Sequence, residues 1–98
     1  MTVLYYDWDL EKNEKLKQER NISFPEIVKA IDEEKLITIL NHPNKGKYPK
    51  QKILVVNVND YAYLVPFIEE KDRIFLKTII PSRKATRDFI FKKIKNSK

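Results

Sequence analysis

Two β-rich runs that meet at Asn59-Asp60 constrain the fold of this 98-residue chain more than any other feature. Val, Ile, Leu and Tyr dominate the runs from Ile53 to Asn59 and from Tyr61 to Phe67, which is a composition typical of strands. Asn followed by Asp is typical of a two-residue turn with positive φ angles. Strands joined by so short a turn are antiparallel. The sequence therefore predicts a tight hairpin here.

Further strands and helices are predicted on both sides of the hairpin. Strands are expected at Val3 to Tyr6, Leu36 to Leu40 and Arg73 to Ile80, with a charged turn at Glu69 to Asp72. Because short turns join most of these strands, the predicted class is α+β in one domain, residues 1–98. It comprises two N-terminal helices, an antiparallel meander sheet of about four strands and a C-terminal helix.

The helix boundaries are predicted from capping residues. Asp9 is the expected N-cap of a helix that runs to about Glu19, and Asn21 suits the left-handed position just beyond it. Ser23-Phe24-Pro25-Glu26 is a capping box that opens a second helix. Ser82 is the expected N-cap of the last helix, whose sheet-facing residues are predicted to be Ala85, Phe89, Ile90 and Ile94.

Composition limits the chemistry that the chain offers. It contains no Cys and one His, which excludes a disulfide scaffold and a thiolate metal site. We therefore expect no metal and no cofactor. The start of the chain shows no signal peptide, and no stretch approaches the ~20 apolar residues of a membrane helix. A cytoplasmic protein without a membrane partner is expected.

The positive charge is concentrated in the second part of the chain. The whole sequence has a net charge of +6. Up to Leu40 there are six Lys and Arg against nine Asp and Glu, a net of −3, whereas from Asn41 onward there are fourteen against five, a net of +9. This asymmetry favours a polyanionic partner. A basic surface that only keeps the protein in solution is an equally weighted alternative.

A cationic helix start follows the last predicted strand. Beyond Pro81 and the Ser82 cap, Arg83, Lys84 and Arg87 crowd the first turn or so. The partial positive charge at the beginning of a helix favours Asp and Glu there, not Lys and Arg. Free backbone N–H groups and additional cations together form an anion site. The residues thus predict that phosphate, as in an RNA backbone, binds at this corner.

Motifs near both ends of the chain resemble those of BrnT-type toxins. The first motif is Tyr6-Asp7-Trp8-Asp9, followed by Lys12 and then Ser23-Phe24. The second is the run from Ile79 to Thr86: an Ile-Ile pair, two residues, two basic residues and Ala-Thr. Between them, His42 precedes a basic loop and a strand in the same order. The resemblance covers almost the whole chain.

This resemblance implies the toxin of a bacterial type II toxin–antitoxin pair, with a RelE-like ribonuclease fold that agrees with the element order above. The implied activity is metal-independent endoribonuclease cleavage of mRNA, which inhibits translation. The implied partners are RNA, free or on the ribosome, and a small cognate antitoxin, commonly of ribbon-helix-helix type. Operator DNA would be reached only through the antitoxin.

Arg83 and Lys84 are the first candidates for catalysis. Metal-free RNA cleavage needs a base, an acid and cations that stabilise charge on the phosphorus oxygens. Arg83 suits the last role because a guanidinium is always charged and grips two oxygens at once. Lys84 is a second clamp or, if desolvated, a proton donor or acceptor. The alternative for both residues is a solvated basic helix start.

His42 and Lys77 are the candidates that would assist proton transfer. Histidine gains and loses a proton near neutral pH, so His42 suits a base or an acid. Its alternative is a loop residue that caps a turn before Pro43. In the resembled family an Arg often precedes the Ile-Ile pair, where Thr78 stands here. Lys77 replaces that Arg if it faces the same edge as Arg83, and is otherwise an exposed strand lysine.

Five further residues are expected to bind RNA without taking part in cleavage: Lys45, Lys47, Tyr48, Lys50 and Arg87. The loop lysines would guide the phosphate backbone, which gives salt-dependent affinity without sequence preference. Tyr48 suits stacking on an unpaired base, worth ~1–3 kcal/mol, and equally suits packing on the core. Arg87 extends the basic face of the last helix.

Two other function classes are also compatible with these residues. The same scaffold could hold RNA or a ribosome without cutting it, which the scarcity of general bases favours. The chain could also be an interaction protein whose basic face meets an acidic partner, most simply the antitoxin.

Overall fold

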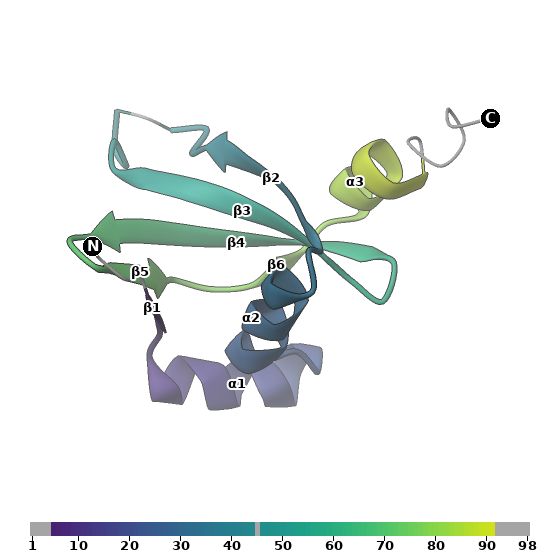
Figure 1. Cartoon of the computed structure of the whole chain (residues 1–98), viewed down its shortest axis with the longest axis horizontal. Coiled ribbons are helices and arrows are strands. Elements are labelled where there is room, and N and C mark those ends of the chain that lie inside the picture. Colours follow the sequence, from purple (N-terminus) through teal and green to yellow (C-terminus); the bar gives the residue numbers. More distant parts are fainter. Residues whose placement is uncertain (1–4, 45, 92–98) are drawn as a thin grey trace.

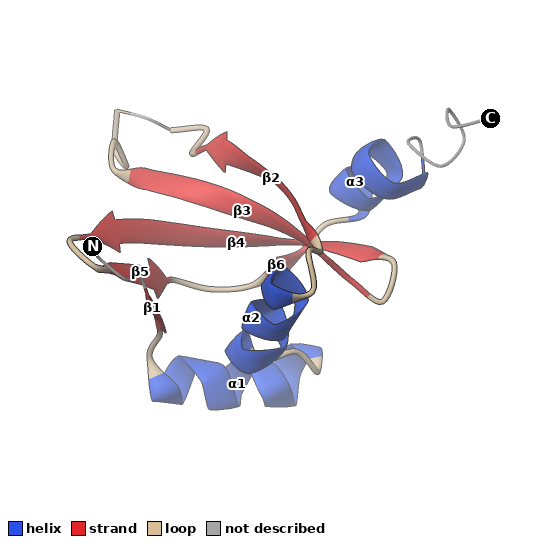
Figure 2. Cartoon of the chain, viewed as in Figure 1, coloured by secondary structure: helices blue, strands red, loops and turns tan. Residues whose placement is uncertain are grey.

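A six-stranded sheet and three helices form the fold, and the computed structural model describes residues 5–44 and 46–91 (Figure 1). The main path of the sheet has the strand order β1-β5-β4-β3-β2, and a short β6 pairs with β4. The strands are β1 Tyr5–Asp7, β2 Leu36–Asn41, β3 Gln51–Val58, β4 Tyr61–Glu70, β5 Arg73–Leu76 and β6 Ile80–Pro81. The helices are α1 Leu10–Arg20, α2 Phe24–Asp32 and α3 Arg83–Ala85, which continues as the π-helical segment η1 Thr86–Phe91 (Figure 2).

The α+β class is confirmed, but the sheet is mixed and not an antiparallel meander of four strands. β1 runs parallel to β5, with Tyr5 opposite Arg73. The other strand pairs are antiparallel. Two parallel strands need a long connection between them. Along the chain, α1 and α2 separate β1 from the other strands and form part of that connection. The sequence prediction missed the parallel pair because a short turn shows only how two consecutive strands pair, and β1 and β5 are not consecutive.

The central hairpin forms where the sequence predicts it. Asn59 and Asp60 have φ angles of 55° and 64°, the positive values of a primed turn. β3 and β4 pair over eight residues in register, from Gln51 opposite Ile68 to Val58 opposite Tyr61. This hairpin is the longest strand pairing and carries the centre of the sheet.

The predicted helix caps are also confirmed. The Asp9 side chain accepts a 2.9 Å hydrogen bond from the Lys12 backbone N–H, and Asn21 adopts a φ of 55°. Ser23 accepts from the Glu26 N–H and donates to the Glu26 carboxylate. One link was not predicted: the buried Asn13 side chain accepts from the Phe24 N–H at 2.8 Å, which fixes α1 against the start of α2.

Helices lie on both faces of the sheet because side chains alternate along β3 and β4. Leu54, Val56, Val65 and Phe67 pack in one core with residues of α1 and α2, among them Leu16, Phe24 and Ile27. Val55 and Ala62 pack in a second core with Ala85 and Ile90. The first cluster is the larger one, so α1 and α2 close the main core. The ring of Trp8 stacks on that of Phe24, with 5.7 Å between the ring centres, and packs against this first core.

The strand predicted from Arg73 to Ile80 is broken into β5 and β6. Leu76 lies opposite Phe67, and Ile80 lies opposite Leu64, so four steps on one chain match three on β4. One extra residue is therefore inserted, which is the definition of a β-bulge. The insertion leaves Ile79 fully buried and turns the chain toward α3.

The last helix begins at the predicted cap, but it is not a regular α-helix. Ser82 Oγ accepts from the Ala85 N–H at 3.0 Å, and the helix becomes π-helical from Thr86 onward. Ala85 and Ile90 are buried as predicted, and Phe89 is partly buried. Ile94 lies outside the described residues.

Candidate nucleic-acid interface

Arg83 and Lys84 stand exposed at the start of α3. Ser82 has an extended backbone and caps the helix, and the first turn contains no acidic residue. Neither cation forms an ion pair with another described residue. Because consecutive helical residues differ by about 100°, the two side chains leave the helix in different directions. Both are nevertheless free to meet an external anion.

Arg87 differs from these two cations. Its Nε lies 3.3 Å from Oδ1 of Asp88; the Arg87 side chain is largely exposed and that of Asp88 is partly exposed. An exposed pair of this kind is weak, but it lowers the local positive charge. Arg87 therefore extends the basic surface less strongly than the sequence indicated.

Lys77 lies in a different place from Arg83. It follows β5 directly, and its backbone N–H donates to the Pro66 carbonyl at 2.8 Å. β5 and α3 are at opposite ends of the sheet (Figure 1). The backbone of Lys77 thus lies next to Pro66 on β4, whereas that of Ser82, which precedes Arg83, lies next to Ala62, four residues away along the same strand.

Lys77 instead shares a cavity of about 720 Å³ with the first half of α1, lined by Asp9, Glu11, Lys12, Lys15, Phe75 and Lys77. The Lys77 ammonium lies 5.7 Å from the centre of the Phe75 ring, and the Arg73 guanidinium lies 5.0 Å from it. The three lysines outnumber the two carboxylates. Sequence reasoning did not assign Lys12 and Lys15 a binding role, although their i,i+3 spacing places them on one side of α1.

His42 is held within its own loop. Its Nδ1 accepts a 3.0 Å hydrogen bond from the Asn44 N–H, so the neutral ring carries its proton on Nε2. This is the turn-capping arrangement that was the alternative to a catalytic role. The ring also packs against Tyr48 at 4.6 Å. As Figure 1 shows, the loop after β2 is at the end of the sheet away from α3.

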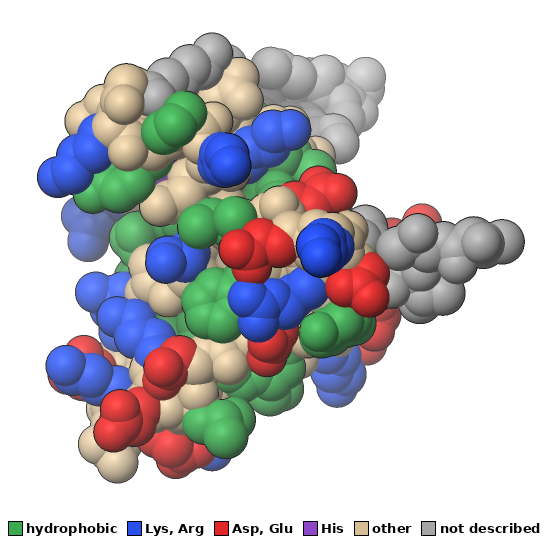
Figure 3. Space-filling model, turned by 90° about the vertical axis from the view of Figure 1, so that its left-hand side faces the viewer, with side chains coloured by type: hydrophobic (Ala, Val, Ile, Leu, Met, Phe, Trp, Pro, Cys, Tyr) green, Lys and Arg blue, Asp and Glu red, His purple; other side chains and the backbone are tan. Residues whose placement is uncertain are grey.

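The remaining RNA-binding candidates belong mostly to the same loop. Tyr48 is half-buried against His42, and the Lys47 ammonium lies 5.4 Å from its ring. Lys47 and Lys50 are exposed and form no ion pair with a described residue. Lys45 lies outside the described residues. Figure 3 views this end of the molecule and shows Lys and Arg side chains along one margin, with mixed charges at the centre.

Among the cations that the structure describes, Arg73 is the one that pairs with two carboxylates. It forms ion pairs with Glu70 at 2.6 Å and Asp7 at 2.8 Å. The hydrogen bonds that its guanidinium donates to these two carboxylates raise the pKa of Arg73 above its ordinary value, with Glu70 contributing most. Arg73 therefore joins β1 to the β4–β5 turn and is less available to a ligand than Lys77.

Tyr63 is an aromatic residue of β4 that lies opposite Pro81, shortly before the start of α3. Burial raises its pKa, and the neighbouring Tyr61 and Glu26 raise it further. Its hydroxyl group therefore remains protonated near neutral pH. Tyr63 is accordingly unsuited to act as a base there.

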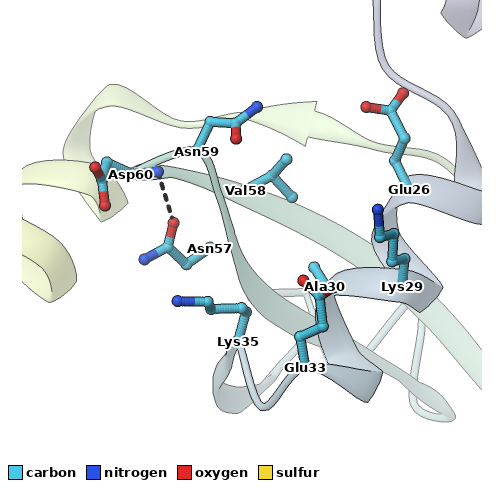
Figure 4. Close-up of a pocket in the computed structure, with 9 residues that line it drawn as sticks. All are labelled: Glu26, Lys29, Ala30, Glu33, Lys35, Asn57, Val58, Asn59 and Asp60. Atoms are coloured by element: carbon cyan, nitrogen blue, oxygen red, sulfur yellow. Dashed lines mark hydrogen bonds between the residues drawn. The ribbon is translucent and has the colours of Figure 1, made fainter.

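A second cavity, of about 330 Å³, separates α2 from the central hairpin (Figure 4). It contains none of the predicted site residues. Glu26, Glu33 and Asp60 supply three carboxylates against the two ammonium groups of Lys29 and Lys35. Because this lining is slightly acidic, it fits a polyanion poorly.

Neither protein-family models, nor curated proteins, nor solved structures give a match to this chain. Within residues 5–44 and 46–91, no group of three or more His, Cys, Asp and Glu is placed to hold a metal ion. No helix in the same residues is long and apolar enough to cross a membrane.

Proposed function

We propose that the protein is the toxin of a type II toxin–antitoxin pair, with a RelE-like layout and metal-independent endoribonuclease activity. The observation that carries this proposal is the exposed pair Arg83 and Lys84, which no described carboxylate neutralises. Cations held at a helix start without an internal counter-ion favour binding of an external phosphate. The antiparallel run β2 to β5, preceded by two helices and followed by α3, supports the layout.

In this proposal Arg83 and Lys84 hold the scissile phosphate and stabilise the charge that develops on its oxygens. Lys77, with Lys12 and Lys15, binds a more distant phosphate of the same strand. Lys47 and Lys50 guide the backbone at the far end of the sheet. The cognate antitoxin and RNA, free or on the ribosome, are the proposed partners, and the cytoplasm is the proposed location.

A binding module that does not cleave RNA is the second candidate function. It is favoured by one specific observation: neither proton-transfer candidate shares a site with Arg83. His42 Nδ1 is occupied by the Asn44 N–H, and Lys77 lines the cavity beside α1. The same cations would then supply affinity for RNA or the ribosome without chemistry.

Growth inhibition by an Arg83→Ala variant tests the proposed toxin. We expect loss of inhibition with an unchanged circular dichroism spectrum and unfolding temperature, because Arg83 is exposed. Lys71→Ala is the matched control, since Lys71 is also exposed but lies in the β4–β5 turn. A folded Arg83→Ala protein that inhibits growth as strongly as the parent would contradict the proposal.

Mapping of RNA ends separates the two candidate functions. Purified protein is incubated with RNA, with and without ribosomes, and new ends are located by primer extension. New ends that disappear with Arg83→Ala support the ribonuclease. Binding without new ends supports the module. In either case, replacing Arg83 and Lys84 by Ala should reduce the slope of log affinity against log salt by about 0.7 for each lost phosphate contact.

A further inference from the structure

Strand β2 is an open edge of the sheet (Figure 1). Its sequence, Leu-Ile-Thr-Ile-Leu-Asn, contains no charged residue and no Pro. Ile39 and Leu40 are 50% and 40% exposed. Natural edge strands are usually protected by charges, Pro, bulges or a covering segment. The register shift of β2 lies at its start, between Leu36 and Thr38, so the rest of the strand remains regular.

The backbone of β2 offers hydrogen-bonding groups on its outer side. The His42 N–H donates to the Gln51 carbonyl, so His42 directs its backbone groups toward β3. In an antiparallel ladder these directions alternate, and Ile39 and Asn41 therefore direct their N–H and C=O groups away from β3. Among the described strands, only β3 pairs with β2.

We propose that two copies of this chain pair through β2, antiparallel, about a two-fold axis at Ile39 that is perpendicular to the sheet. In such a pair, the outward N–H and C=O groups of one β2 must face the outward groups of the other. This condition is met when Ile39 of one copy lies opposite Ile39 of the second copy. Ile39 lies opposite Leu54 of β3, on the α1–α2 face, so the two Ile39 side chains meet on that face. Leu40 then lies opposite Thr38 of the second copy on the other face.

The charges that flank β2 favour a second copy over an unrelated strand. Residues 32–35, before the strand, contain three acidic residues and one Lys, a net charge of −2. Residues 42–50, after the strand, contain three Lys, a net charge of +3. Antiparallel self-pairing places the acidic flank of each copy against the basic flank of the other. Charge complementarity of this kind fixes partner and orientation.

The resulting interface is a single strand pairing with two covered apolar side chains per copy. Stable assemblies usually bury more than about 1,200 Å² in total, so the dimer should be weak and concentration-dependent. The pairing can be tested separately from the proposed function, because Ile39, at its centre, is not a candidate for phosphate binding, although the basic flank includes the RNA-binding candidates Lys47 and Lys50.

Sedimentation equilibrium of the full chain over a range of concentrations tests the pairing. We expect a monomer–dimer equilibrium in which Ile39→Lys raises the dissociation constant at least tenfold, because two like charges would meet at the axis. Leu10→Lys is the matched control: it makes the same charge change at a residue that is 76% exposed on α1. It should leave the dissociation constant unchanged.

Cross-linking tests the register without relying on affinity. The sequence has no Cys, so Ile39→Cys introduces one thiol per copy. Directly opposed residues in an antiparallel pair lie about 5.5 Å apart between Cα atoms, within the range of a disulfide. Tyr5→Cys is the control, since Tyr5 is 51% exposed on the opposite edge strand. We expect disulfide dimers at least ten times faster with Ile39→Cys.

Three outcomes would overturn the inference. They are a monomer at all soluble concentrations, a dimer that Ile39→Lys leaves intact, and equal cross-linking rates for the two thiol variants. A monomer that instead captures a strand of a different protein at β2 would also reject the second copy as the occupant.

Discussion

Nη1 of Arg20 donates a 2.6 Å hydrogen bond to the carbonyl oxygen of Ile79, although the two residues are 59 positions apart. Arg20 ends α1, and Ile79 lies in the bulge between β5 and β6, just before the Ser82 cap. The bond ties the first helix to the segment that leads into α3. Through this contact, α1 helps to determine where Arg83 is presented.

Arg20→Ala should lower the free energy of unfolding by about 1–2 kcal/mol, because a hydrogen bond from a charged donor is lost at a partly buried site. Urea denaturation followed by fluorescence of Trp8, the single Trp, measures the change. Lys17→Ala is the control, since it removes only an exposed ion pair with Glu14 and should cost less than about 0.5 kcal/mol. Equal losses would argue against the role of Arg20.

Thr86→Val should lower the free energy of unfolding by about 1–3 kcal/mol, since it leaves a buried N–H without a partner. Thr86 is buried, and its hydroxyl accepts from the Ala62 N–H at 2.8 Å and donates to the Ser82 carbonyl at 2.7 Å. Thr86→Ser keeps both bonds and should be milder. Urea denaturation compares the variants, and a Val variant as stable as the Ser variant would refute the prediction.

Asp60→Gly should raise the free energy of unfolding by about 0.5–1 kcal/mol. Asp60 has a φ of 64°, a conformation that Gly adopts without the steric cost of a Cβ. The substitution keeps the hydrogen bond that the backbone N–H of residue 60 donates to Oδ1 of Asn57. Asp60→Ala keeps the Cβ and should destabilise the hairpin, so thermal unfolding of the two variants should shift in opposite directions.

Stability should fall as the pH rises above 10, and Tyr63→Phe should reduce that fall. The pKa of Tyr63 is raised from 10.0 in the folded protein, mainly by burial. The folded state then binds more protons than the unfolded state above pH 10, so the free energy of unfolding decreases as pH rises. Unfolding temperatures between pH 9 and about 11.5 measure this. Burial also raises the pKa of Tyr6, so Tyr6→Phe should act in the same direction.

If a variant that carries both Tyr63→Phe and Tyr6→Phe loses stability with rising pH just as the parent does, the two raised pKa values do not cause the alkaline loss of stability. Absorbance of the ionised phenol, recorded for the parent and for this variant in the same titration, shows whether Tyr6 and Tyr63 ionise above their ordinary pKa in the folded protein. The expected result is a delayed absorbance rise in the folded parent and an earlier rise once it is unfolded in urea.

In the candidate site, the sequence predicted the exposure of Arg83 and Lys84 but not the position of Lys77. Arg83 and Lys84 lie exposed at a helix start, as the sequence indicates, because the Ser82 cap is a local interaction. Lys77 is only six residues before Arg83, yet it belongs to another part of the surface. A strand rises about 3.3 Å per residue, so close positions in an extended segment can lie far apart. Nothing in the spacing of the lysines alone indicated the cavity that Lys77 shares with α1.

Local residue preferences were enough to predict the hairpin at Asn59-Asp60, the caps at Asp9, Ser23 and Ser82, and the left-handed turn at Asn21. Each depends on backbone preferences and hydrogen bonds between residues three or fewer positions apart. Three other features could be seen only once the chain was folded: the parallel pairing of β1 with β5, the bulge that Arg20 contacts, and the separation of the predicted cations into distinct groups. These features arise from contacts between distant residues, in which packing of the whole sheet outweighs local preference.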